Sequence, residues 1–194
     1  MIAPIRIQDD RGGLDHLGPE FLTWLWWRSE SSPGFTHPDG TEVFLHVDDH
    51  LEFRGERAAS KRTVLRAGAP SASMESRAAL RSGKLLVAAR LLLARGEDEV
   101  AFTLKAEDMD VSGLKLPKPS EAKSMGPRER LEGQLEAFDR FWEDLDLCYA
   151  AFLETRTSDD WDGQLELIRT WCERPSQDEG GLTRYRDETH APLR

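Results

Sequence analysis

The sequence predicts an α+β fold in which an antiparallel sheet packs with helices and is followed by a C-terminal helical hairpin. Two patterns carry this prediction. Around 43–53 and 89–104, large apolar residues recur at every second position on either side of a turn, as they do in strands with one buried face. From Leu131 to Phe152, apolar residues recur instead at helical spacing. Runs of strands followed by helices are typical of α+β proteins.

The first predicted helix begins at Gly18-Pro19 and ends before Ser31–Gly34. Its segment FLTWLWWRSE, residues 21–30, holds three of the six tryptophans. The helix is apolar around most of its circumference, which favours burial on several sides. We therefore predict that these indoles pack in the core. Stacking of nucleic-acid bases, which usually involves interleaved Lys and Arg, and binding of a protein partner are the alternatives.

Two β-hairpins are predicted. In the first, the loop Asp48-Asp49-His50 pairs Val47 with Leu51 and Leu45 with Phe53. In the second, Gly96-Glu97 is a two-residue turn. Its register is Arg95 with Asp98, Leu93 with Val100, Leu91 with Phe102 and Ala89 with Leu104. All three apolar pairs then share one face.

Between the hairpins, the sequence predicts a strand around Thr63–Arg66 and a short helix that Pro70-Ser71 opens and Gly83 ends. The proline-containing stretch 117–127 reads as a linker. It separates an α+β domain of residues 1–116 from a helical hairpin of residues 128–174 packed on that domain. Residues 175–194 form a polar tail that we expect to be disordered.

Charge is segregated along the chain. Ten basic and two acidic residues lie between 54 and 95, so this segment carries +8 in a chain of net charge −10. Residues 1–53 carry −7 and residues 96–194 carry −11. Because polyanions respond to the local field, the segment is a candidate phosphate-binding surface. The alternative is that it neutralises the acidic segments within one fold.

The predicted second hairpin places Lys84, Arg90 and Lys105 on the face opposite the core. Other cations lie on the short helix and before it. The predicted contacts to the DNA backbone are Lys61, Arg62, Arg66, Arg77, Arg81, Lys84, Arg90 and Lys105. Such a set lacks side chains arranged to read bases, so binding independent of sequence is expected.

No motif predicts catalysis, a cofactor or a metal. The stretch HVDDH, residues 46–50, offers four potential metal ligands, but the hairpin register separates them. Arg81-Ser82-Gly83-Lys84 differs from a phosphate-binding loop, because Ala78 and Leu85 stand where glycine and a hydroxyl residue are required. We therefore expect a non-enzymatic protein. The two cysteines, Cys148 and Cys172, are read as buried free thiols of a cytoplasmic protein.

The order of these segments resembles the recombination-associated RdgC family. The features that carry the resemblance are the helix FLTWLWWRSE, the loop Gly34-Phe35, the strands around VFLHV and HLEF, a helix ending in Ser82-Gly83-Lys84, and a later strand VAFTL. The resemblance covers roughly residues 17–116 and only the later half of a family member. It implies a homodimer that closes around duplex DNA, contacts to the DNA backbone at Gly83-Lys84 and the bordering basic residues, and restraint of RecA-type recombinases.

Two functions follow as hypotheses. The first is a cytoplasmic, nucleoid-associated, homodimeric protein that binds double-stranded DNA through residues 54–95. The second is a protein-interaction or regulatory module that has lost DNA binding, with a partner held by the acidic helix 128–156. Residues 127–162 carry eleven acids against four bases, which suits a basic partner. No apolar run reaches the roughly 18 residues of a membrane span, so no membrane partner is expected.

Overall fold

The computed structural model describes residues 17–55, 63–66, 74–117 and 126–173, and it confirms the predicted α+β class. The predicted tail 175–194 and the expected helix start at Pro70-Ser71 lie outside these residues. The elements, in chain order, are α1 (Leu17–Ser31), β1 (Gly34–Thr36), β2 (Glu42–Arg54), β3 (Thr63–Arg66), α2 (Met74–Arg81), β4 (Leu85–Arg95), β5 (Asp98–Lys105), β6 (Val111–Lys115), α3 (Pro127–Thr157) and α4 (Trp161–Glu173).

The sheet is antiparallel, with the strand order β1-β2-β4-β5-β6, and β3 also pairs with β2. The predicted second hairpin is confirmed as β4–β5, including all four residue pairs of its register. Gly96 has a φ of 62° at the turn, a left-handed conformation that glycine adopts without steric cost.

The predicted first hairpin is wrong, because residues 42–54 form the single long strand β2. Val47 pairs with Leu91 and Leu51 pairs with Ala89 of the same neighbouring strand, β4. Residues 48–50 therefore form an irregularity within β2 rather than a turn. The apolar residues on both sides of it still face the core, which is why the alternating pattern alone did not distinguish a hairpin from a bulged strand.

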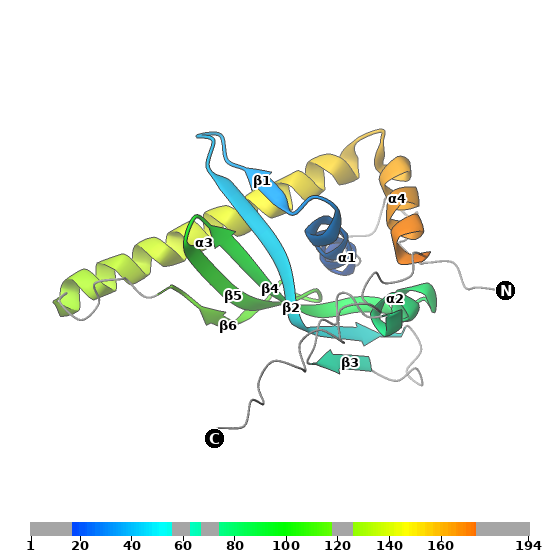
Figure 1. Cartoon of the computed structure of the whole chain (residues 1–194), viewed down its shortest axis with the longest axis horizontal. Helices are drawn as coiled ribbons and strands as arrows, with labels where there is room; N and C mark the ends of the chain where they lie inside the picture. The colour runs from blue at the N-terminus through cyan, green and yellow to red at the C-terminus, as the bar shows by residue number, and fades with distance from the viewer. Residues whose placement is uncertain (1–16, 56–62, 67–73, 118–125, 174–194) are drawn as a thin grey trace, which may run out of the picture.

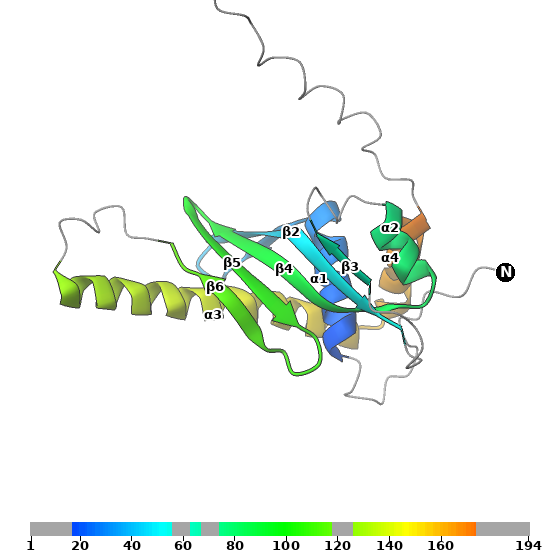
Figure 2. The same ribbon diagram turned by 90° about the horizontal axis from the view of Figure 1, so that it is seen from below.

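The helices and the sheet form two layers. Seen from below in Figure 2, α1 and α3 lie behind the sheet and run along the same face of it, while α2 and α4 lie together at one end. The opposite face carries no helix in the part of the chain that the structure describes (Figures 1 and 2). We call it the open face.

The core lies between α1, the sheet and the two C-terminal helices. Trp24 and Trp26 are 2% and 0% exposed, which confirms that these two indoles pack in the interior, whereas Trp27 is only partly buried against the same core. Phe152 of α3 joins three helices, since its ring contacts those of Phe21 and Trp24 on α1 and of Trp161 on α4. One apolar cluster thus includes residues of the sheet, of α1 and of both C-terminal helices.

The N-terminal end of α1 approaches the sheet closely at Gly18. A Cβ atom at this position would lie 1.8 Å from the carbonyl oxygen of Ala106, which follows β5. Only glycine leaves room for this approach, so the identity of residue 18 fixes how near α1 sits to the sheet.

Candidate interaction surfaces

Of the eight predicted DNA contacts, the structure describes the side chains of five, and these five do not gather into one patch. Lys61, Arg62 and the side chain of Arg66 lie outside the described residues. The other five come from different elements: Arg77 and Arg81 from α2, Lys84 from the start of β4, Arg90 from β4 and Lys105 from β5.

Arg90 and Lys105 lie on the open face. Arg90 stands between the buried Ala89 and Leu91, so its side chain leaves the opposite side of the strand. Lys105 pairs with Ala88, as the sequence predicted. Lys84 lies just before β4, and its ammonium donates a 2.7 Å hydrogen bond to the hydroxyl of Thr63 in β3.

Carboxylates accompany the cations of the open face. The guanidinium of Arg90 is 2.8 Å from Asp48, and the ammonium of Lys105 is 2.6 Å from Asp110. The hydrogen bond and charge of Asp110 raise the pKa of Lys105 above its usual value. The contact of Arg90 with Asp48 agrees with the alternative reading, in which the basic segment is neutralised within the fold.

A groove of about 610 Å³ lies at one end of the open face, beside the N-terminal end of α1. Its lining carries both signs of charge, since Arg54 and Lys105 alternate with Glu52, Glu107 and Asp108. Arg54 is also within 3.8 Å of Glu107, although both side chains are well exposed. The groove is therefore lined by both positive and negative side chains and does not form a continuous positive surface for a phosphate backbone.

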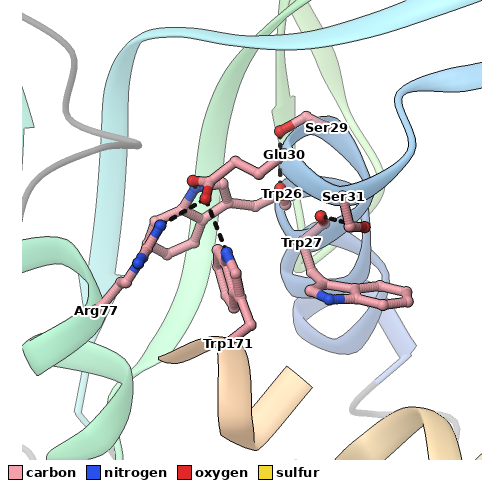
Figure 3. A network of polar contacts seen from close by, with 7 residues as sticks. All are labelled: Trp26, Trp27, Ser29, Glu30, Ser31, Arg77 and Trp171. Carbon is pink, nitrogen blue, oxygen red and sulfur yellow. Dashed lines mark hydrogen bonds and ion pairs between the residues drawn. The ribbon is translucent and has the colours of Figure 1, made fainter. Parts of the chain in front are cut away.

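Arg77 belongs to the interior (Figure 3). Its guanidinium donates a 2.5 Å hydrogen bond to the Glu30 carboxylate and lies 5.0 Å from the centre of the Trp171 ring. The same carboxylate accepts the indole N–H of Trp171 at 2.8 Å and that of Trp26 at 3.0 Å. This Glu30 network ties α2 and α4 to the end of α1. Arg77 is therefore an interior side chain in this structure, not part of an exposed cationic face.

A second buried ion cluster fixes the middle of α3. Asp144, which is 4% exposed, accepts a 2.8 Å hydrogen bond from the His37 ring and lies 3.2 Å from the guanidinium of Arg95. His37 comes from the loop between β1 and β2, and Arg95 ends β4. Two connections of the sheet therefore hold α3 in place at this point.

The first half of α3 carries an exposed apolar stripe. Leu131 and Leu135 are 56% and 54% exposed, and Phe138 and Trp142 are each 39% exposed. Both views show this part of α3 continuing beyond the sheet (Figures 1 and 2). We call these four side chains the α3 stripe. Their spacing of four, three and four residues puts them on one side of the helix.

The same line of α3 is covered further along. Leu145 is 6% exposed, and the Tyr149 ring packs edge-on against Phe21 of α1 at 5.0 Å. The second half of α3 is therefore covered along this line, whereas the α3 stripe in the first half is exposed. The regular apolar spacing over 131–152 was visible in the sequence, but the point where its cover ends was not.

Acidic side chains border the α3 stripe on one side. On a helix of 3.6 residues per turn, the stripe occupies about 60° of arc, and four acids occupy a neighbouring band of about 60°. They are Glu132, Glu136, Asp139 and Glu143, and all are exposed. The other border turns toward the sheet, because Ala137 and Phe141 are buried there.

Within the described residues, no three His, Cys, Asp or Glu side chains come together as metal ligands. No helix in the described ranges combines the length and apolar character needed to cross a membrane. Cys148 and Cys172 are buried free thiols, as predicted. Burial raises the pKa of each to about 12, so neither is a nucleophile at neutral pH.

The chain matches no protein-family model, and no curated protein matches its sequence. The resemblance to the RdgC family therefore stays a prediction. The open face of the sheet and the α3 stripe are the two surfaces that bear on function.

Proposed function

We propose that this protein is a protein-interaction module whose docking surface is the α3 stripe. The observation that supports this proposal is the exposure of four large apolar side chains in a row on one ordered helix. Scattered exposed apolar residues are common on protein surfaces, but a contiguous row marks a binding site. Aromatic residues such as Phe138 and Trp142 are also enriched where partners bind.

The support beneath the stripe suits a docking role. The contacts of Asp144 and the burial of Phe141 anchor α3 immediately beside it. A partner therefore meets a helix that is already formed, and little ordering entropy is lost on binding. The acidic border repels phosphate backbones, which favours protein over nucleic acid at this surface.

Photo-crosslinking tests this proposal. Leu135 is replaced by a photoreactive benzoyl-phenylalanine in the full chain, expressed in its native cells. Leu167, which is 53% exposed on α4, receives the same replacement as a matched control. We expect one dominant protein adduct at position 135 that persists after nuclease treatment. Absence of an adduct, or the same adducts at both positions, contradicts the proposal.

A second candidate function is sequence-independent association with double-stranded DNA, as in an RdgC-like homodimer acting in recombination at the nucleoid. It is favoured by the position of Arg90, which belongs to the basic segment 54–95, and of Lys105 on the open face. Phosphates would have to displace Asp48 and Asp110 from these cations. We therefore expect weak binding that falls steeply with salt.

Fluorescence anisotropy with a random-sequence duplex at two salt concentrations tests this second function. Replacing Lys105 by alanine should reduce the slope of log affinity against log salt by about 1. Arg128, an exposed residue of α3, is the control, and its replacement should leave the slope unchanged. Failure to bind at low salt, or binding indifferent to salt, rules out this function.

A further inference from the structure

We infer that the occupant of the α3 stripe is an amphipathic helix of a partner protein with Lys or Arg along one border of its apolar face. This inference rests on the proposed docking function and adds the chemistry of the partner. It is carried by three features: the geometry of the stripe, the charge beside it and the helix that already covers its continuation.

The geometry of the stripe fits a helix. From Leu131 to Phe152, apolar residues follow alternating steps of four and three, which is the spacing at which two helices interlock side chains. Leu131, Leu135, Phe138 and Trp142 supply about three turns of such a surface. Recognition of an amphipathic helix by its residues at these spacings is a common mode of protein binding.

The continuation of the stripe is already packed by a helix. Phe21 of α1 lies on Tyr149, and Phe152 contacts both Phe21 and Trp24. These ring contacts between α1 and α3 fall on the second half of α3, and the stripe itself stays exposed. A partner helix on the stripe would therefore extend a helix-on-helix contact that α3 makes within its own fold.

The charge beside the stripe selects the partner. Glu132, Glu136, Asp139 and Glu143 form an acidic border on the solvent side. Glu132 is paired with Arg128 and Glu143 lies 3.8 Å from Arg95, so Glu136 and Asp139 carry the centre of this border. A helix lying on the stripe brings one of its own borders next to these acids. Basic residues on that border of the partner helix are attracted to the acids of α3, and the attraction is stronger where water is partly excluded, whereas acidic residues there are repelled.

This border also disfavours a second copy of the chain. In an antiparallel pair of α3 helices, the acidic border of one copy would face that of the other. A parallel pair would need the opposite border, where Ala137 and Phe141 already pack toward the sheet. A basic helix from another protein meets neither obstacle.

Two synthetic peptides serve as probes for the full chain. Each has 21 residues with leucine at every apolar heptad position, and the borders are lysine in one and glutamate in the other. Fluorescence anisotropy gives the affinity of each. We expect the lysine peptide to bind at least about tenfold more tightly at low salt, with the difference narrowing as salt rises.

Variants localise the contact. Leu135→Ala should lower the affinity for the lysine peptide about tenfold. The reason is that the exposed half of the leucine side chain, which the peptide would bury, is then missing. Leu167→Ala, a change of the same kind on α4, should leave the affinity unchanged. The double variant E136K/D139K should reverse the preference between the peptides, which a purely structural role of these acids would not do.

Three results overturn the inference. They are equal or absent binding of the two peptides, affinity unaffected by Leu135→Ala or by the charge reversal, and self-association of the chain that Leu135→Ala abolishes. The last result identifies a second copy as the occupant. A protein adduct at position 135 without a charge preference rejects only this inference and leaves the docking function standing.

Discussion

The Glu30 network allows a quantitative prediction about how α2 and α4 are held. Glu30→Gln keeps the shape of the side chain and removes the charge that faces Arg77. The arginine side chain is 9% exposed and that of Glu30 is 27% exposed, so the pair is largely shielded from water. The carboxylate also accepts two indole N–H groups, from Trp26 and Trp171.

The expected loss is about 2–3 kcal/mol in the free energy of unfolding. Breaking a fully buried ion pair by removing one partner costs about 3–5 kcal/mol. The partial exposure of Glu30 lowers this figure, and the glutamine oxygen still accepts part of the hydrogen bonding. For a domain of this size, the change corresponds to a melting temperature lower by about 4–12 °C.

Urea denaturation followed by tryptophan fluorescence measures this loss. Glu132→Gln is the matched control, because it breaks the exposed pair with Arg128 and should cost less than about 0.5 kcal/mol. Adding Arg77→Met to Glu30→Gln should recover part of the loss, since the cation is then removed as well. If Glu30→Gln costs no more than the control, the network does not hold these helices and the reasoning fails.

Two further predictions concern α1 and the thiols. Gly18→Ala should lower the free energy of unfolding by about 1–3 kcal/mol in urea denaturation, because the new Cβ would overlap the Ala106 carbonyl oxygen. A change near zero would show that α1 can shift away from the sheet without cost. Burial raises both cysteine pKa values from 9.0 to about 12 on folding, so the folded protein favours the protonated thiols. Their contribution to the free energy of unfolding is therefore lost as the pH rises from 9.0 to about 12. Ellman's reagent should therefore react with Cys148 and Cys172 only after unfolding at about pH 8, and rapid labelling of the native protein would contradict their burial.

Local patterns predicted much of the fold. The β4–β5 register followed from three apolar pairs and one charged pair across a two-residue turn, all set by neighbours in sequence. The burial of Trp24 and Trp26 followed from a helix that is apolar on most sides. In both cases, nearly all of the information lies within about twenty residues.

What the sequence could not supply depends on distant partners. An alternating pattern fits a hairpin or one bulged strand equally well, and only the presence of β4 along the whole of β2 decides. The sequence also did not predict that Arg77 is buried, because its partner Glu30 lies 47 residues away along the chain. Leu131 and Leu145 likewise belong to the same apolar spacing, although the first is 56% exposed and the second only 6%.

The most direct test of an open docking surface compares Leu135→Ala with Leu145→Ala by urea denaturation in dilute protein. The two leucines lie on the same helix and are 54% and 6% exposed. We predict a loss below about 0.5 kcal/mol for the first and of about 2–4 kcal/mol for the second. A similar loss at both positions would contradict the account, because it would mean that the α3 stripe is already covered.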